Sequence, residues 1–295
     1  MPMLLRCSAF YAVILFLAGC AGRQTMWEKK TSESMSIGKT KISNSDLQQK
    51  GDEAWQKRLD KTQLESAIAI WEEGDLSDFQ ILVKLSRAHY LLADGFISFE
   101  GNNEAMMKTY QKGVDYAERA LLLLSPQFKE RVQTGTGVEQ AVEIVGMDGV
   151  PALYWYAANL GKWALAKGFT TVLFWKDAIK AIMQRCLTLD ERFFYAGPHR
   201  YFGSFYAKAP SFAGGDLTKS KEHYEKAISL FPEYLATQVL YAEYYAVKSQ
   251  NPVLFEKTLK EVLASEVEKN TDILPENSIE KKKAERLLGK KEELF

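Results

Sequence analysis

The chain has 295 residues, of which 46% are apolar, so it can bury a sizeable core. It carries 38 basic and 38 acidic residues, and this balance argues against nucleic-acid binding, which needs a basic surface to neutralise phosphates. No long stretch alternates apolar and polar residues as strands do, and the few prolines fall mainly at expected helix boundaries. These features predict an all-α protein.

The first twenty residues have the organisation of a bacterial export signal. Arg6 precedes the apolar run Phe10 to Leu17, which is too short to span a bilayer. The run ends in Leu-Ala-Gly-Cys20, which resembles a lipobox, so we expect residues 1–19 to be a lipoprotein signal peptide and Cys20 to carry the lipid, palmitate included. Two acyl chains suffice for stable membrane anchoring. The alternative is a plain secretory signal in which Cys20 is incidental.

Residues 20–49 are polar, with Ser, Thr, Lys and Gly and only scattered apolar positions. We expect a flexible tether, and about thirty such residues reach roughly 30 Å as a coil. The tether would lift a helical domain, residues 50–295, away from the membrane. Within that domain Cys186 has no cysteine partner and occupies a small position of a predicted helix, so we expect a buried structural thiol.

Apolar residues recur at helical spacing along most of residues 50–295. Pro126 is expected to end a helix, whereas Pro151 and Pro252 are placed to begin one. The helices predicted with the clearest pattern are 79–93, 105–124, 151–163 and 175–189. A tail helix, 278–295, has Ile279, Ala284, Leu287 and Leu288 on one side and the lysines 281–283 on the other, which is typical of a solvated terminal cap.

Residues 128–150 interrupt this pattern. They contain Gly135-Thr-Gly137, but a G-x-G with no preceding strand is a weak phosphate-binding signal. We interpret the segment as a linker between helical pairs, with a short helix near 138–145.

The stretch from Tyr195 to Pro232 is the best-preserved helical pair. Its first half has His199, Phe202, Gly203 and Tyr206 at the spacing W-x2-L-G-x2-Y, and its second half has Ser220, Tyr224 and Ala227 at the spacing of A-x3-F, followed by Pro232. This is the pattern of a tetratricopeptide repeat. We therefore predict an α-solenoid of degenerate tetratricopeptide-like hairpins.

The turn inside this pair is longer than a standard repeat turn. It contains the candidate partner-contact residues Pro210, Gly214, Gly215 and Asp216. Long turns of a helical array lie on one face and are often functional.

No catalytic motif is present. None of the three histidines has a metal-binding spacing, and His89 and His199 occupy repeat positions that favour a core role. We therefore expect neither an enzyme nor a cofactor or metal.

Aromatic residues are dense on the first helices of the pairs. Neighbours such as Tyr244 and Tyr245 point about 100° apart on a helix, so both cannot fill the same core. The surplus side chains either line a cavity for an apolar ligand or belong to the core after all. The candidates for a ligand-binding channel are Tyr154, Trp155, Trp163, Phe202, Tyr206, Tyr241, Tyr244 and Tyr245.

Several motifs in order resemble the T component of tripartite ATP-independent periplasmic (TRAP) transporters. The resemblance covers roughly residues 50–295 and the lipoprotein signal. The motifs are Pro151 to Gly161, His199 to Gly203, Pro210 to Asp216, Lys221-x2-Tyr224-Glu-Lys-Ala-Ile, Tyr241 to Ala246, and Ala284-x2-Leu-Leu with the closing Glu-Leu-Phe295.

The resemblance implies a lipid-anchored protein on the periplasmic side of the bacterial cell envelope, and Ala21 after Cys20 is compatible with the outer membrane. It implies association with the transporter's periplasmic solute-binding protein, a homotrimer, and passage of a small hydrophobic ligand through an aromatic-lined channel. The alternative from another class is an adaptor for envelope protein assembly that binds peptides in a concave groove. A continuous aromatic tunnel favours the first hypothesis, and a filled core beside an open, charged groove favours the second.

Overall fold

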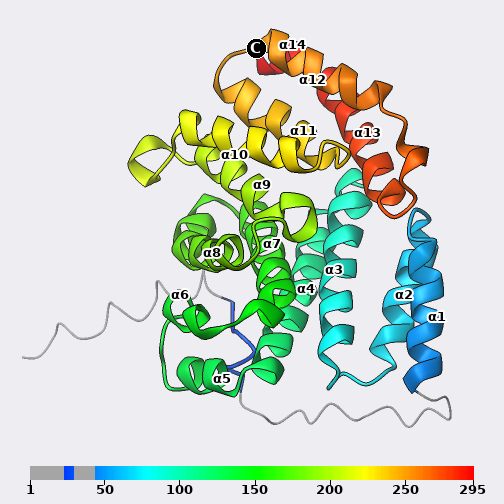
Figure 1. Ribbon diagram of the computed structural model, residues 1–295, viewed down its shortest axis with the longest axis vertical. Coiled ribbons are helices and arrows are strands. Elements are labelled where there is room, and N and C mark those ends of the chain that lie inside the picture. Colours follow the sequence, from blue (N-terminus) through cyan, green and yellow to red (C-terminus); the bar gives the residue numbers. More distant parts are fainter. Residues whose placement is uncertain (1–22, 30–43) are drawn as a thin grey trace, which may run out of the picture.

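The computed structural model describes residues 23–29 and 44–295, and every regular element in these ranges is a helix (Figure 1). The prediction of an all-α protein is confirmed. Cys20 and the predicted signal peptide lie outside the described residues. The helices are α1 (Asn44–Gln56), α2 (Lys61–Glu72), α3 (Phe79–Gly95), α4 (Asn103–Leu124), α5 (Pro126–Gln133), α6 (Val138–Ala141), α7 (Val150–Lys167), α8 (Phe169–Leu189), α9 (Phe193–Lys208), α10 (Leu217–Leu230), α11 (Ala236–Leu240), α12 (Pro252–Ala264), α13 (Leu274–Leu288) and α14 (Lys291–Leu294).

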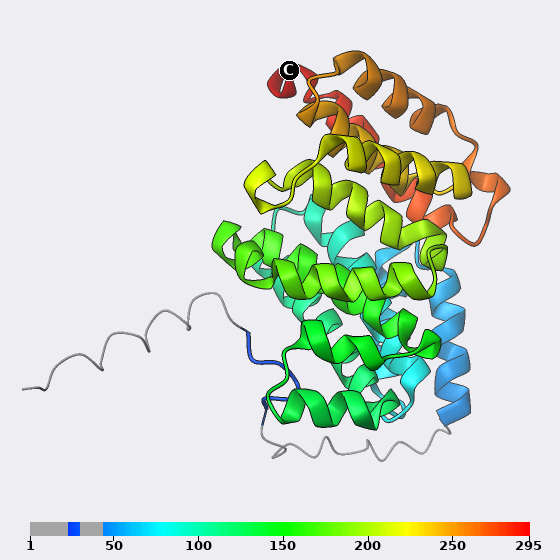
Figure 2. The same cartoon turned by 60° about the vertical axis from the view of Figure 1, so that its left-hand side comes forward.

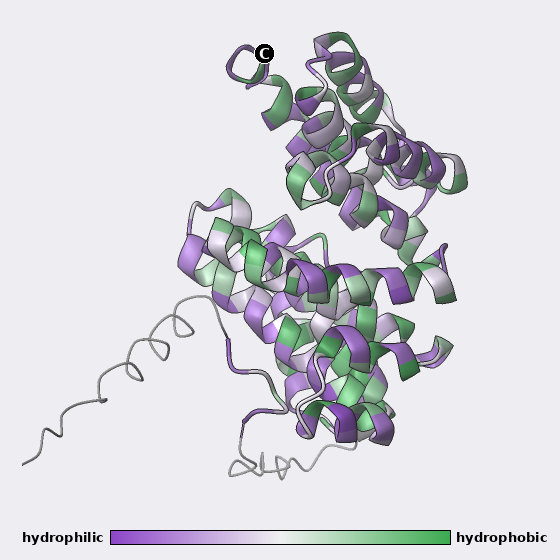
Figure 3. Ribbon diagram, turned by 90° about the vertical axis from the view of Figure 1, so that its left-hand side faces the viewer, coloured by the Kyte–Doolittle hydropathy of each residue, from purple (hydrophilic) through white to green (hydrophobic). Residues whose placement is uncertain are grey.

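Successive helices pack as pairs: α1 with α2, α3 with α4, α7 with α8, and α9 with α10. A fifth pair joins α12 to α11 and its π-helical continuation, η5 (Tyr241–Ala246). Figure 2 shows these pairs stacked one upon the next, from α5 at one end to α12 and α14 at the other. Most of the helices carry both hydrophobic and hydrophilic residues (Figure 3), as amphipathic helices of a stacked array must. The arrangement is consistent with a tetratricopeptide-like fold.

The largest apolar core lies among α3, α4, α7 and α8. Leu82, Leu121, Leu153 and Ile182 are almost fully buried in it, and burying one such side chain stabilises the fold by about 1.5–3 kcal/mol. Cys186 belongs to the same core, as predicted, and burial raises the pKa of its thiol.

Close helix contact explains the glycine of the best-preserved pair. A Cβ on Gly203 would lie 2.8 Å from the Tyr224 ring, so only glycine fits where α9 crosses α10. The Ser220 hydroxyl also donates to the Gly203 carbonyl across the same crossing, at 2.7 Å. The small residues of the repeat pattern therefore set the helix spacing.

Short polar side chains fix several helix starts. Asp60, Asp78, Asn102 and Asn251 each accept a backbone N–H at the start of the following helix. Such caps contribute about 1 kcal/mol each.

The predicted linker 128–150 contains more helix than expected. Pro126 does follow the end of α4, but with Ser125 as cap it also begins α5, which the sequence pattern missed. The short helix expected near 138–145 is present as α6 and a 3-10 turn.

Residues 23–29, which lie within the predicted tether, are packed against the helical body. The Arg23 guanidinium forms ion pairs with Asp115 and with Glu118, a fully buried residue of α4. The Met26 backbone N–H also donates to Glu118, at 2.9 Å. The Trp27 ring meets Phe128 and Tyr156 edge-on at centroid distances of 5.9 and 6.2 Å. A freely extended coil is therefore the wrong description of these seven residues, and α1 begins six residues before the expected domain boundary.

Helix α13, the last long helix of the chain, packs back against an early part of the array. Besides packing on α12, it contacts α3, where a Cβ on Gly95 would lie 2.6 Å from Ile279 Cδ1. Lys283 of α13 reaches Asp94 of α3 at 2.5 Å. The expectation that the lysines 281–283 form a solvated face is therefore wrong for Lys283, because the helix lies against a neighbour that the local pattern does not reveal.

Candidate functional site

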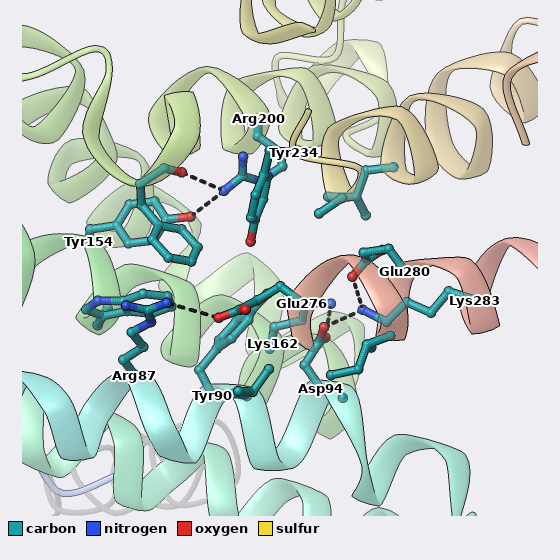
Figure 4. A pocket seen from close by; sticks show the side chains of 17 residues that line it. Arg87, Tyr90, Asp94, Tyr154, Lys162, Arg200, Tyr234, Glu276, Glu280 and Lys283 are labelled. Carbon is teal, nitrogen blue, oxygen red and sulfur yellow. Dashed lines mark hydrogen bonds and ion pairs between the residues drawn. The ribbon is translucent and has the colours of Figure 1, made fainter. Parts of the chain in front are cut away.

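A cavity of about 60 Å³ lies where α3 and α7 meet the helices that follow α8 (Figure 4). Its walls come from five parts of the chain: α3, α7, the start of α9, residues 234–240 and α13. They include apolar side chains, aromatic rings and seven charged groups. The charged lining residues are Arg87, Asp94, Lys162, Arg200, Glu276, Glu280 and Lys283.

One wall is an ion-pair cluster centred on Asp94. The Asp94 carboxylate accepts from Lys162 and Lys283, each at 2.5 Å, and Lys283 also donates to Glu280 at 2.7 Å. Burial alone would raise the pKa of the Asp94 carboxyl, but the two ammonium groups outweigh it and hold the pKa well below its ordinary value. The cluster is therefore charged at neutral pH, and it ties α3 and α7 to α13.

A second ion-pair cluster is centred on Glu276 of α13. Its carboxylate accepts from Arg58 and from Arg87, each at 2.9 Å. Arg58 lies in the turn after α1, so this contact joins residues 218 positions apart in the chain. Below, the term charged interface denotes both clusters, namely Arg58, Arg87, Asp94, Lys162, Glu276, Glu280 and Lys283.

A left-handed turn at the start of α9 forms the third wall. Phe194, Tyr195 and Ala196 have φ values of 45°, 56° and 55°. For residues other than glycine this conformation costs roughly 1–2 kcal/mol each. The turn aims two backbone carbonyls at Arg200, whose guanidinium donates to Tyr195 O at 2.8 Å and to Phe194 O at 3.1 Å. The buried arginine thus stabilises the strained turn, and the turn places the Phe194 ring in the cavity wall.

Aromatic rings complete the lining. The Trp155 ring centroid is 5.0 Å from that of Tyr154 and 4.6 Å from that of Phe194. The guanidinium of Arg200 lies over the Tyr234 ring at 4.6 Å, a cation–π contact. The cavity therefore combines flat apolar surfaces with polar groups, as small-molecule sites do.

The structure brings two of the eight aromatic channel candidates to this cavity, Tyr154 and Trp155. Trp163 and Phe202 are buried in the core around α7 and α8. Tyr206 packs on Phe202, Tyr241 stacks on Tyr245 at 4.9 Å, and the Tyr244 ring faces the Lys208 ammonium at 4.2 Å. These six residues do not line the cavity.

The long turn between α9 and α10 lies outside the cavity. Gly214 has φ 95°, and a Cβ on Gly215 would overlap the Ala209 carbonyl, so both glycines are needed for the turn geometry. Asp216 caps α10 by accepting from Lys219 N at 3.1 Å. The turn, which starts at Pro210, presents Phe212, whose side chain is 83% exposed and was not singled out from the sequence.

A separate open groove of about 240 Å³ runs between α2, α3 and α4. Charged residues at its rim include Glu65, Glu72, Lys108 and Lys112, and Ile68 and Leu92 lie below them. His89 is buried at its base and stacks on Tyr116. His199, also buried, lies 2.9 Å from His223, nitrogen to nitrogen. Within residues 23–29 and 44–295 there is no group of three or more His, Cys, Asp or Glu that could hold a metal ion.

Most of the cavity residues were missed in the sequence because their partners are distant in the chain. Arg200, Glu276 and Lys283 look like ordinary surface positions when only neighbouring residues are considered. One usable signal existed: Arg200 follows His199 within the repeat pattern, on a helix whose other faces carry aromatic residues.

The model of the family described as TRAP transporter T-component matches residues 87–295, which is more than half of the chain and includes all of the residues that line the cavity. No curated protein matches the chain. Among the described residues, none of the helices has the length and apolar content needed to cross a bilayer.

Proposed function

The chain belongs to the TRAP transporter T-component family, and from this premise we propose that it is a lipid-anchored envelope protein that docks the transporter's solute-binding protein. Membership gives it an accessory role beside a TRAP transporter. The proposal adds a partner, an anchor at Cys20 and a ligand, which is admitted to the cavity between α3, α7, α9 and α13.

One observation carries the ligand part of the proposal. The cavity is walled by rings from three separate elements, Trp155 on α7, Phe194 in the left-handed turn and Tyr234 before α11. A strained turn held by a buried arginine is costly, and such strain concentrates at functional sites. An array that served only as a spacer would gain nothing from it.

Docking is proposed at the turn between α9 and α10. Phe212 is 83% exposed there, and aromatic anchors are enriched at protein interfaces. The test is co-purification of the solute-binding protein of the same transporter with the full chain. We expect Phe212→Ser to weaken the complex at least tenfold. The matched control is Val253→Ser on α12, because Val253 is 76% exposed but lies in another hairpin.

Failure to recover any solute-binding protein with the wild-type chain would falsify the docking proposal. If Phe212→Ser and Val253→Ser weaken the complex equally, the turn is not the contact site. The anchor is tested separately by Cys20→Ser, which should release the protein from membranes into the soluble fraction.

The groove between α2, α3 and α4 favours a second candidate, an adaptor that binds peptides. Its charged rim and apolar base are what a peptide groove needs. If Lys112→Glu abolishes binding of an envelope protein while the solute-binding protein fails to bind at all, the adaptor function replaces the transporter-docking function.

A further inference from the structure

Three titratable side chains make successive contacts across the α9–α10 hairpin. Glu191 lies just before the left-handed turn, His199 lies on α9 and His223 lies on α10. His199 Nε2 is 3.0 Å from the Glu191 carboxylate, and the other ring nitrogen of His199, Nδ1, is 2.9 Å from His223 Nδ1. These contacts tie both helices of the hairpin to the segment that precedes them.

The two contacts limit how many protons the histidine pair can hold. An ionised carboxylate only accepts, so His199 Nε2 must carry a proton. The hydrogen bond from His199, together with the nearby Lys226 ammonium, lowers the pKa of the Glu191 carboxyl, so the carboxylate persists in mild acid. Two ring nitrogens 2.9 Å apart can share one proton but not two, because every donor needs an acceptor. A fully protonated pair therefore cannot keep this contact.

Aromatic rings hold His223 in its position. Its ring stacks on Phe202 at 5.3 Å and on Tyr206 at 5.7 Å, and Phe202 is fully buried. Burial, and then the charge of His199, lower the pKa of His223 to about 4. The histidine of an unfolded chain has a pKa of about 6.5. The closed hairpin therefore excludes a proton that an open hairpin would take up.

Other charges near the hairpin have partners of their own. Of the described acidic residues, Glu191 alone accepts from either imidazole ring. On α10, Lys226 lies 4.0 Å from Glu191, and Lys219 lies over the Tyr206 ring at 5.7 Å. Titratable and charged groups on the elements packed around the pair contact other residues; they are Tyr154 of α7, Asp177, Lys180 and Arg185 of α8, Arg192 before α9, Arg200 of α9 and Tyr241 of η5.

We propose that Glu191, His199 and His223 form a proton-sensitive clasp, which closes the α9–α10 hairpin at neutral pH and releases it in mild acid. A second proton on the pair replaces the hydrogen bond between the rings with two like charges in contact. The left-handed turn and the turn with Phe212 both belong to this hairpin, so acid loosens a wall of the cavity and the proposed docking site together. The effect on docking rests on the proposed function, whereas the clasp itself does not.

Proton linkage gives the direction of the effect. Because the pKa of His223 is lower in the folded protein than in the unfolded chain, its contribution to stability is complete above about pH 6.5. The contribution is lost as the pH falls from there toward about 4. Within this window each pH unit shifts the equilibrium between closed and open hairpin by up to about tenfold.

The test follows amide hydrogen exchange of the full chain by mass spectrometry at pH 7 and pH 5. Peptides from α3 and α4 serve as the internal reference, because the intrinsic exchange rate itself changes with pH. We expect the protection of α9 and α10, relative to this reference, to fall about tenfold at pH 5. His223→Gln cannot titrate and should lose most of this change. The matched control, Lys226→Gln, removes a neighbouring charge on the same helix and should keep it.

A second measurement examines the wild-type protein directly, in case His223→Gln folds poorly. NMR spectra of the histidine rings should show His223, assigned as the signal that this variant lacks, titrating near pH 4. Titration of His223 near pH 6.5, or a loss of protection that is absent or is shared equally by His223→Gln, overturns the clasp. Binding of the solute-binding protein is measured at the same two pH values. If the hairpin loses protection while this binding is unchanged, the clasp stands and docking at the Phe212 turn is overturned.

Discussion

The core among α3, α4, α7 and α8 and the charged interface hold the molecule together by different means. In the core, Leu121 and Leu153 are fully buried among apolar neighbours. At the charged interface, α13 is joined to α3 by the partly buried ion pair Asp94–Lys283 and to the turn after α1 by the buried ion pair Arg58–Glu276. The core has no room for a ligand, whereas the ion pairs of the charged interface place polar atoms around the cavity. The cavity therefore lies where α13 packs back against α3.

The largest effect is expected from breaking the charged interface. Asp94→Ala leaves the partly buried ammonium groups of Lys162 and Lys283 without their shared partner, and removing one member of a buried ion cluster costs about 3–5 kcal/mol. We expect a loss of about 4 kcal/mol in the free energy of unfolding, measured by urea denaturation. A loss below about 1 kcal/mol means that the interface is not structural.

The same carboxyl gives a pH dependence with a definite sign. The folded-state pKa of Asp94 lies below its unfolded value of about 3.9, so the folded protein binds fewer protons at this site. Its stabilising contribution is complete above that unfolded value and is lost as the pH falls toward the folded pKa. The stability difference between wild type and Asp94→Asn should be constant between pH 5 and 7 and shrink in acid. A difference that grows in acid contradicts this assignment.

The apolar core should be slightly less sensitive to a single truncation. Leu153→Ala removes a fully buried side chain and is expected to cost about 3 kcal/mol through lost burial and the remaining cavity. Unlike the effect of Asp94→Ala, this loss should not change with salt, because no charge is involved. Denaturation curves at low and high salt distinguish the two regions.

Helix spacing at the charged interface can be tested without changing a charge. Gly95→Ala places a methyl group 2.6 Å from Ile279 Cδ1, so either the Ile279 side chain must rotate or α3 and α13 must move apart. Overpacking of this kind costs about 1–3 kcal/mol, and we expect a value near the lower end because the Ile279 side chain can rotate. Ligand titration of the same variant would show whether the cavity tolerates the shift.

The smallest effect is expected from an exposed ion pair. Lys108 and Glu104 form an i, i+4 pair on α4, and both side chains are three-quarters exposed. Lys108→Ala should leave the free energy of unfolding unchanged within the error of the measurement, because solvent screens an exposed ion pair. This variant is the control for Asp94→Ala, and a larger effect would mean that charge removal is generally destabilising in this protein.

The two regions also differ in how well the sequence predicts them. The helical pairs can be predicted from apolar periodicity and from helix-start signals such as Asn251-Pro252, which begins α12 as predicted. These signals are local, so a single sequence carries them. The cavity depends on contacts between Arg58 and Glu276 or Asp94 and Lys283, which are set by how the whole array curves. A lysine on a polar helix face looks solvated until a distant helix is placed beside it.

The left-handed turn was unpredictable for another reason. Phe194, Tyr195 and Ala196 are not residues that favour positive φ, and nothing in their local sequence compensates for it. The compensation comes from Arg200 and from the stacking of Tyr195 on Tyr234, at a ring distance of 4.7 Å. Tertiary contacts override local preference here, at the wall of the candidate site.

The packing of residues 23–29 against the helical body has a consequence for how the protein would be oriented at a membrane. Arg23 is fixed to Asp115 and Glu118 of α4, and it follows Cys20 by only three residues. A fully extended chain advances at most about 3.6 Å per residue, so a lipid on Cys20 would begin within about 11 Å of the α4 surface. The anchor would then hold the helical stack close to the headgroups. It would also restrict which way the cavity and the Phe212 turn face relative to the membrane.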